Sequence, residues 1–388
     1  MDPTPRIIDA DMHFVEGRTT WLDRIEPGFR DRALRIVDDE RGFPWVVCGD
    51  RRIHLAELTV PGRVDLLGVG RRHEREWDGV RPPSWEEQLR PEDHDPAARL
   101  RQMDEAGIDA AVFFPNYGLT WEDLLRDDLP ATCANMQAYN DWAIEMSAAA
   151  PGRLYGVAHL TLRAAEWAER EIARLARAGI RLAMIGPNPV DGKPLAHPAL
   201  DRLWACFQDH DVAPVFHVSY FRRPLDPAWY EMDPDDLNKL MDMMFLHVAP
   251  AVAIANLIIH GKLEQFPRLR LGIMELTARW VPEFLMHLDG AFNFYELMNA
   301  RPLTKLALRP SEYFRRQVRV AAFGAEGPSD LIRRAGEDLF MWCSDYPHAE
   351  GLVNPLADYR DFAPGLSVRG SAQLFGGNAA WLLGLAGP

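Results

Sequence analysis

Short apolar runs recur along the chain from residue 95 onward, and each alternates with a stretch of helical spacing. Apolar runs bounded by turn residues are typical of buried strands, whereas apolar positions three or four residues apart are typical of amphipathic helices. In the segment 97–106, Leu100, Met103 and Ala106 lie on one side of a predicted helix that Gly107 ends. The same pattern predicts strands at 110–114, 154–158, 182–186, 213–218, 269–275, 318–322 and 339–345.

One further apolar run, Ile7-Ile8, opens the chain, so the pattern contains eight strand–helix units. Strands that alternate with helices form parallel sheets, and eight such units favour a closed (β/α)8 TIM barrel. An open doubly wound sheet is the competing α/β architecture. No Gly-x-Gly-x-x-Gly follows the first strand, so a dinucleotide site of that architecture is not indicated.

Residues 17–95 interrupt this rhythm with a stretch rich in Arg, Asp, Gly and Pro. Within it, 33–37 and 45–48 are predicted to be short strands separated by turn residues. We interpret the segment as an insertion, either a lid or a structural elaboration, within one domain that spans residues 1–388. Length alone would also allow two or three domains.

Polar residues alternate at the end of the opening strand, where Asp9, Asp11 and His13 are two residues apart. Side chains with that spacing share one face of a strand. Carboxylates beside an imidazole suit a divalent metal ion, although a solvated strand end would show the same pattern. We expect Asp11 and His13 to be metal ligands and Asp9 to support them.

Three later strands also end in polar residues, namely His217, Glu275 and Asp345. The carboxyl ends of barrel strands meet at one mouth, so these side chains are predicted to lie close together. Each one alone could be an ordinary polar core residue, but several carboxylates near a core are costly unless a cation binds them. Nitrogen and oxygen donors without thiolate suit Zn, Mn or Fe(II).

Composition and net charge indicate which classes of binding partner the protein has. The 388-residue chain is 47% hydrophobic and carries a net charge of −14 with a pI near 5.3, which argues against nucleic acid. The cysteines, Cys48, Cys133, Cys206 and Cys343, form no Cys-x-x-Cys pair and indicate a reduced, cytoplasmic protein. There is no signal-peptide pattern, and the apolar stretch 248–259 is too short to span a bilayer. We therefore expect a soluble protein with a small-molecule substrate and no membrane partner.

Several motifs resemble the amidohydrolase superfamily, in particular the branch related to aminocarboxymuconate semialdehyde decarboxylase and the resorcylate decarboxylases. The matching segments are 9–16 (DADMHFVE), 261–267 (GKLEQFP), 344–348 (SDYPH) and, at the end of the chain, 377–385 (GNAAWLLGL). The resemblance implies a metal-dependent TIM-barrel enzyme that forms homo-oligomers, often dimers. It also implies four metal ligands: Asp11, His13, His217 and Asp345.

The chain departs from this family at two positions. Many relatives have histidine at the position of Asp11. At the position of Glu275, a histidine is often found. The fourth strand ends in Gly186-Pro187-Asn188 without a lysine, so a dimetal centre built on a carbamylated lysine is not implied. We expect one ion. Glu275 could be a ligand of that ion or a bridge to a second one, so the number of ions stays open.

The leading functional hypothesis is hydrolysis of an amide, ester or thioester carbonyl by a metal-activated water. Asp345 would move the proton, Glu275 would ligate the metal or act as base or acid, and His348 would bind substrate or orient Asp345. One alternative is decarboxylation of an aromatic or unsaturated acid, in which Arg222, Arg223 or Arg279 would offset the charge of Glu275. Another is a binding barrel without catalysis.

Five further residues are candidate substrate contacts, each of which could also be structural: His260, Asn116, Tyr220, Arg222 and Trp280. The aromatic members could line an apolar pocket. Asn116 follows the second strand, where its side chain could hydrogen-bond the substrate or simply form a turn.

Overall fold

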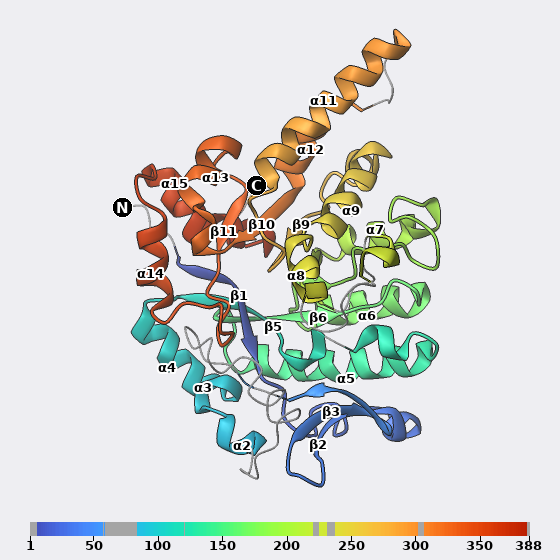
Figure 1. Ribbon diagram of the computed structural model, residues 1–388, viewed down its shortest axis with the longest axis vertical. Helices are drawn as coiled ribbons and strands as arrows, with labels where there is room; N and C mark the ends of the chain where they lie inside the picture. The colour runs from blue at the N-terminus through green and yellow to red at the C-terminus, as the bar shows by residue number, and fades with distance from the viewer. Residues whose placement is uncertain are drawn as a thin grey trace.

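A computed structural model of the chain describes residues 6–56, 58, 84–119, 121–219, 225–230, 237–301 and 306–385. Eight parallel strands form one sheet in which each strand pairs with the next along the chain (Figure 1). They are β1 (Ile8–Phe14), β5 (Ala110–Pro115), β6 (Leu154–His159), β7 (Leu182–Met184), β8 (Ala213–Phe216), β9 (Leu271–Ile273), β10 (Val318–Ala322) and β11 (Phe340–Trp342).

The first and last strands meet, and this contact makes the sheet a barrel. The Asp345 N–H donates to the Asp11 carbonyl at 2.9 Å, and the His13 N–H donates to the Tyr346 carbonyl at 2.6 Å. The predicted TIM barrel is therefore confirmed.

Helices follow the strands and cover the outside of the barrel (Figure 1). The longer helices are α4 (Pro96–Ala106), α5 (Leu129–Ala148), α6 (Ala165–Arg177), α7 (Asp201–Asp209), α8 (Leu237–Met244), α9 (Val248–Ile259), α11 (Val281–Asn299), α12 (Pro310–Gln317), α13 (Pro328–Ala335) and α14 (Pro355–Phe362). Shorter ones are α2 (Trp85–Gln88), α3 (Pro91–His94), α10 (Lys262–Gln265), α15 (Val368–Ala372) and α16 (Asn378–Leu382).

Local sequence sets the helix ends. Asp95 accepts hydrogen bonds from two N–H groups in the first turn of α4, and Gly107, with φ of 74°, ends that helix as predicted. α5 begins at Leu129, because Asp128 caps it and accepts the Ala131 N–H. Gly261, where φ is 71°, separates α9 from α10.

Two apolar layers surround the strands. A smaller cluster inside the barrel contains Ile8, Ala10, Val112 and Phe114, and a larger one lies between strands and helices. Alternation along each strand assigns its residues to one layer or the other.

A β-bulge in β1 changes this alternation at the opening motif. Asp9 pairs with Ala111 and Met12 with Phe113, so three steps along β1 match two along β5. The extra residue puts Asp9 and Met12 on the outer face, under α4, while Ala10 stays inside. The prediction that Asp9 shares a face with Asp11 and His13 is therefore wrong.

The segment 17–95 contains an antiparallel sheet of β2 (Leu34–Asp38), β3 (Pro44–Cys48) and β4 (Arg51–Leu55). This sheet lies beside α5 (Figure 1), where the Leu34 N–H donates to Asn135 Oδ1 at 2.9 Å and Arg32 pairs with Asp128 at 2.7 Å. Residue 57 and residues 59–83 lie outside the described residues, so a lid remains a prediction.

Among the described residues, one helical stretch, Leu240–Ile259, is long and apolar enough to cross a membrane by length and composition alone. A turn at 245–247 separates α8 from α9 within it. Core helices also pass this test, and α9 buries Ile254, Leu257 and Ile258.

Candidate metal centre

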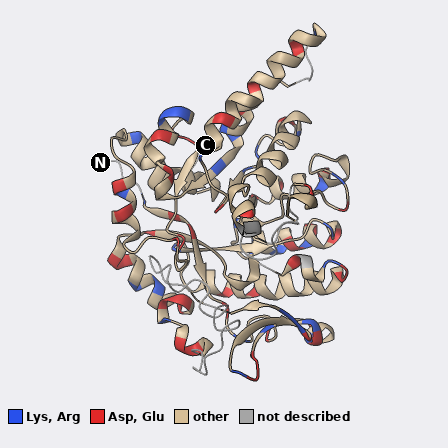
Figure 2. Cartoon of the chain, in the orientation of Figure 1, with Lys and Arg blue, Asp and Glu red and all other residues tan. Residues whose placement is uncertain are grey.

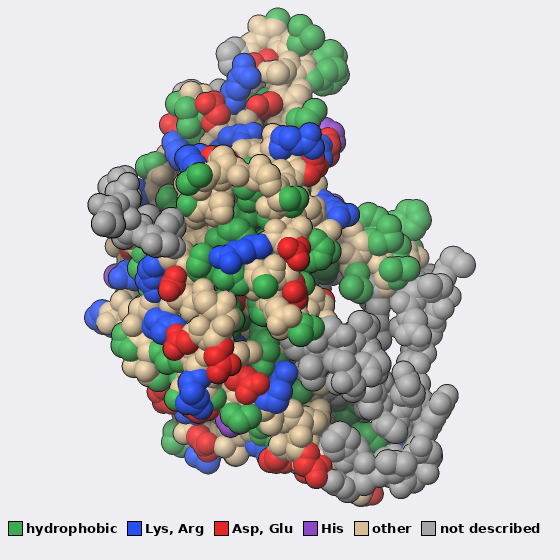
Figure 3. All heavy atoms as spheres, turned by 90° about the vertical axis from the view of Figure 1, so that its left-hand side faces the viewer, with side chains coloured by type: hydrophobic (Ala, Val, Ile, Leu, Met, Phe, Trp, Pro, Cys, Tyr) green, Lys and Arg blue, Asp and Glu red, His purple; other side chains and the backbone are tan. Residues whose placement is uncertain are grey.

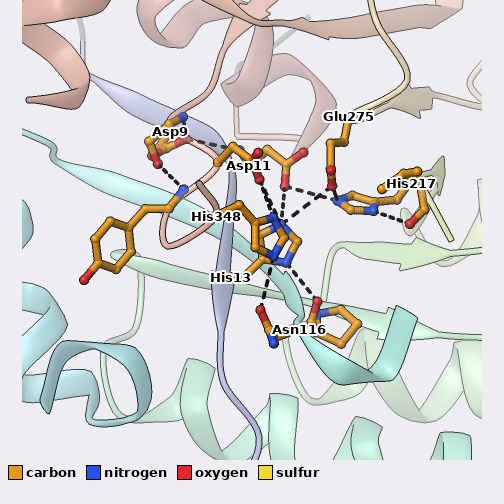
Figure 4. A network of polar contacts seen from close by, with 12 residues as sticks. Asp9, Asp11, His13, Asn116, His217, Glu275 and His348 are labelled. Carbon is orange, nitrogen blue, oxygen red and sulfur yellow. Dashed lines mark hydrogen bonds and ion pairs between the residues drawn. The ribbon is translucent and has the colours of Figure 1, made fainter. Parts of the chain in front are cut away.

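Polar side chains from four strands meet at the carboxyl-terminal mouth of the barrel (Figure 4). β1 carries Asp11 and His13, and His217, Glu275 and Asp345 follow the last residues of β8, β9 and β11. All are fully buried except Glu275, whose side chain is 11% exposed. The barrel thus assembles every first-choice metal ligand that the sequence predicted.

The two imidazoles face the carboxylates. His13 Nε2 lies 3.3 Å from Asp345 Oδ1, 3.7 Å from Asp11 Oδ1 and 3.9 Å from Glu275 Oε2. His217 Nε2 lies 3.4 Å from Asp11 Oδ1 and 3.2 Å from Glu275 Oε2. One compact donor set therefore joins strands from both sides of the mouth.

Backbone carbonyls fix the protonation of both rings. His13 Nδ1 lies 2.8 Å from the Pro115 carbonyl, and His217 Nδ1 lies 2.8 Å from the Val218 carbonyl. Because a carbonyl only accepts, each Nδ1 carries a proton, and Nε2 is the ring nitrogen that faces the carboxylates. Metal-bound histidines are oriented in this way by their second nitrogen.

Buried atoms in this cluster have no hydrogen-bond partner among the described residues: Asp11 Oδ1 and Oδ2, His13 Nε2, His217 Nε2, Glu275 Oε2 and Asp345 Oδ2. Buried acceptors normally find a donor, since an unsatisfied one costs about 1–3 kcal/mol. The ligand atoms of Asp11, His13 and His217 lie within 4.8 Å of one another, as do those of His13, Glu275, Asp345 and His348. A divalent cation would satisfy all of these acceptors together, so the donor set fits a metal ion.

Two ligand candidates adopt backbone conformations that are rare for residues with a side chain. Glu275 has φ of 51° and Asp345 has φ of 53°, both in the left-handed region. Such a conformation costs about 1–3 kcal/mol and clusters at functional sites. The Asp345 backbone is held by its bond to Asp11, so the barrel closure also aims this carboxylate.

Charges within the centre shift its pKa values in opposite directions. Burial, and then the negative charges of Asp345 and Asp11, raise the pKa of Glu275 well above its usual range. Burial, together with the positive charge of His348, lowers the pKa of His13 to about 4. His13 is therefore neutral at pH 7, as a metal ligand must be.

His348 completes the centre by linking two elements. Its Nδ1 lies 2.9 Å from Asp345 Oδ1, its Nε2 lies 3.1 Å from Asn116 Oδ1, and its ring is 4.0 Å from the His13 ring (Figure 4). Burial alone would lower the pKa of His348, but the charge of Asp345 and the hydrogen bond to it raise that pKa to about 9. His348 is thus an imidazolium that donates to both oxygens, and Asn116 holds its outer nitrogen.

Two buried carboxylates support the centre from outside it. Asp9 Oδ1 accepts the Ser344 N–H at 3.0 Å and the Asp11 N–H at 3.2 Å, so it ties β1 to the residues that follow β11. Glu16 accepts the backbone N–H groups of residues 116–118 at 3.2, 2.9 and 2.9 Å. It thereby shapes the loop that carries Asn116.

Among the described residues, three other predicted contacts do not reach this cluster. His260 is exposed at the end of α9, on the segment that leads to the amino-terminal end of β9. Trp280 stacks on His247 and donates its indole N–H to the Thr277 carbonyl at 2.9 Å. Arg279 is exposed and donates to the carbonyls of residues 325 and 326. Tyr220, Arg222 and Arg223 lie outside the described residues.

One polar residue at the mouth was missed by the sequence analysis. His159 is the last residue of β6 and is 3% exposed, with Nε2 3.4 Å from Glu122 Oε2. It ends an apolar run in the same way as His217, but the predicted strand stopped at residue 158.

Comparison with known proteins agrees with this geometry. The sequence model of the family described as "Amidohydrolase" matches residues 8–385, so the chain belongs to this family. It is an enzyme of the metal-dependent amidohydrolase superfamily. A search of curated proteins finds no match.

Solved structures share the fold over nearly the whole chain. The amidohydrolase map2389c from Mycobacterium avium subsp. paratuberculosis K-10 is 26% identical, with a TM-score of 0.78 and coverage of 98% of this chain and 100% of that one. The 5-carboxyvanillate decarboxylase LigW2 from Novosphingobium aromaticivorans, solved with bound manganese, is 20% identical (TM-score 0.65, coverage 98% and 97%). The 2,6-dihydroxybenzoate decarboxylase from Rhizobium is 18% identical (TM-score 0.63, coverage 99% and 100%).

Removing one ligand should abolish metal retention. We expect His217→Asn and Asp11→Asn to weaken Mn²⁺ binding by more than the 10–100-fold typical of residues that merely orient ligands. Metal content after dialysis and the Mn²⁺-induced rise in Tm measure this effect; the ion should stabilise the wild type by about 2.7 kcal/mol at 100 times Kd. His210→Asn, at an exposed position after α7, is the matched control. Equal metal retention in all three variants would contradict the assignment.

Proposed function

We propose that the chain is a divalent-metal-dependent carboxy-lyase that releases CO2 from a small aromatic or unsaturated carboxylic acid. The observation that carries this proposal is the imidazolium of His348, hydrogen-bonded to Asp345 beside the metal ligands. It offers an anionic substrate a positive charge and offers the reaction a proton. Two whole-chain neighbours in fold that decarboxylate 5-carboxyvanillate and 2,6-dihydroxybenzoate support the same reaction class.

Each residue of the centre would have its own role in this reaction. Asp11, His13, His217 and Asp345 would hold the ion, which when bound supplies a Lewis acid for the substrate carboxylate and a neighbouring oxygen. The bond from the substrate to its carboxylate carbon breaks and leaves its electron pair on the substrate, and CO2 departs. The carbon that lost CO2 takes a proton from the Asp345–His348 pair, which is then reprotonated from solvent.

Manganese is the ion that we propose. The donor set combines imidazole nitrogen with carboxylate oxygen and has no thiolate, which suits Mn, Fe(II) or Zn. The manganese in the 5-carboxyvanillate decarboxylase structure supports the first choice. One ion is proposed, because β7 ends without a lysine to bridge a second.

Hydrolysis is the second candidate, and Glu275 is the observation that favours it. Its carboxylate lies 3.2 Å from His217 Nε2, where it could accept a proton from an attacking water at an amide, ester or thioester. A neutral histidine at this position would repel an anionic acid less than the carboxylate of Glu275 does, so glutamate favours an uncharged substrate.

Product analysis separates the two reactions. With Mn²⁺-loaded protein and a panel of hydroxylated benzoates in D2O, we expect stoichiometric CO2 and one deuterium at the carbon that lost it. Activity should disappear on chelation and return with Mn²⁺, and His348→Gln should lower kcat by about 10²–10⁴-fold. Incorporation of ¹⁸O from labelled water into the products of an ester or amide panel, without CO2, would instead establish hydrolysis.

We also propose that the protein acts in the cytoplasm and forms homo-oligomers. All of Cys48, Cys133, Cys206 and Cys343 are free thiols, which supports a reducing compartment. Helix α11 supports self-association, because it projects from the barrel with apolar side chains gathered at its tip (Figures 1 and 3). Phe294, Leu297 and Met298 there are 65%, 80% and 68% exposed.

A second copy of the chain is the proposed occupant of α11. Five large apolar residues of this helix, Met286, Phe294, Tyr295, Leu297 and Met298, are 48–80% exposed. Large exposed apolar patches mark protein–protein interaction sites. Residues 281–299 contain acidic residues but no Lys or Arg (Figure 2), which disfavours an anionic membrane surface.

Charge on this helix should dissociate the oligomer. We expect light scattering to give a dimer or higher species for the wild type and a monomer for Phe294→Glu/Leu297→Glu. The helix content should stay unchanged by circular dichroism. Val368→Glu, at a 92% exposed position on α15, should leave the mass unchanged. A monomeric wild type at micromolar concentration would contradict the proposal.

A further inference from the structure

His159 stands out among the buried histidines because the fold clamps its backbone. Asn140 of α5 accepts the His159 N–H at 2.7 Å and donates to the His159 carbonyl at 3.2 Å. Asn140 also donates to Glu171 at 2.8 Å, and Arg174 holds that carboxylate in turn. Both backbone groups of a strand-end residue are thus fixed by a buried side chain that is itself fixed.

The strand directs the His159 side chain into the mouth of the barrel. His159 pairs with Met184 of β7, and Met184 belongs to the inner apolar layer together with Val157. Because side chains alternate along β6, His159 shares the inner face with Val157. It sits at the carboxyl-terminal end of that face, the end at which the metal ligands lie.

One loop joins His159 to the metal centre. The loop after β5 begins at Asn116, which hydrogen-bonds His348, and five residues later places Trp121 and Glu122 against His159. Trp121 is 1% exposed, and its ring meets the His159 ring edge-on with centroids 5.5 Å apart. The same loop therefore borders the ion site and this second group.

Two polar atoms of this pair are unsatisfied. His159 Nδ1 and Trp121 Nε1 are buried and have no hydrogen-bond partner within the part of the chain that the structure describes. The contact of His159 Nε2 with the Glu122 carboxylate favours the tautomer with the proton on Nε2, so Nδ1 is an acceptor. The indole N–H of Trp121 can only donate.

An acceptor and a donor on neighbouring rings match a group that donates to the first and accepts from the second, as a hydroxyl does. We propose that His159 and Trp121 form a subsite for a substrate hydroxyl, across the mouth from the metal ligands. This inference rests on the proposed function and deepens it, because it makes the substrate a hydroxylated ring acid with a hydroxyl distant from its carboxylate. Asn140 and Glu122 are positioning residues for His159.

The subsite is tested with full-length, Mn²⁺-loaded protein and ligands that differ by one hydroxyl. The substrates are 2-hydroxybenzoate and its 2,3-, 2,4-, 2,5- and 2,6-dihydroxy counterparts, and the non-reacting ligands are the corresponding phenols, whose Kd is measured by calorimetry. The test variants are Trp121→Phe, which keeps the ring and removes the N–H, and His159→Gln. Matched controls are Trp167→Phe on α6 and His210→Gln after α7.

We expect the wild type to prefer one dihydroxy ligand over its deoxy counterpart by about 10–100-fold in Kd, and in kcat/KM where CO2 is released. Trp121→Phe and His159→Gln should reduce that preference to about threefold or less, while affinity for the deoxy ligand and metal content stay unchanged. The control variants should keep the full preference.

Two results would overturn the subsite. One is a wild type without preference for any second hydroxyl, which would assign these atoms to a structural water only. The other is a preference that survives in both test variants. Failure of the proposed function gives a different result. If no acid releases CO2 but the phenols still show a preference that depends on Trp121, decarboxylation is rejected and the subsite is kept.

Discussion

Repulsion between lone pairs at the barrel mouth is the constraint on which the rest of the structure depends. Two imidazoles present Nε2 atoms to three carboxyl groups at 3.2–3.9 Å, and several of these buried atoms have no hydrogen-bond partner among the described residues. Burying oxygen and nitrogen acceptors together at such distances is costly unless a cation binds them. Binding of a divalent ion therefore turns the most unfavourable cluster of the fold into its functional centre.

Several features of the barrel serve this cluster. The bulge in β1 turns Asp9 outward, which frees it to hold the backbone of Asp11 and Ser344. Left-handed backbone at Glu275 and Asp345 aims two carboxylates inward from strand ends that would otherwise continue the sheet. His348 then supplies the one positive charge in direct hydrogen-bond contact with the cluster in the described structure, and Asn116 fixes it from the neighbouring loop.

The fold could be predicted because the spacing of apolar residues shows which positions are buried. In this barrel the same strand–helix pattern occurs eight times. The sequence predicted Asp11, His13, His217, Glu275 and Asp345 for a related reason, since polar residues at the carboxyl ends of apolar barrel strands lie at the mouth. It misplaced Asp9 because a bulge changes the facing of side chains without changing their spacing. His159 was missed because the predicted strand stopped one residue early, and the backbone clamp from Asn140 joins residues that only tertiary structure brings together. His260 is exposed at the end of α9, where Gly261 with its left-handed backbone separates α9 from α10.

The central claim is that these strand ends bind one divalent ion. The most direct test is an anomalous difference map from crystals grown with Mn²⁺, collected at the manganese edge. The account predicts a single peak at about 2.0–2.2 Å from Asp11, His13 Nε2, His217 Nε2 and Asp345. No peak at this position, or two peaks bridged by Glu275, would contradict it.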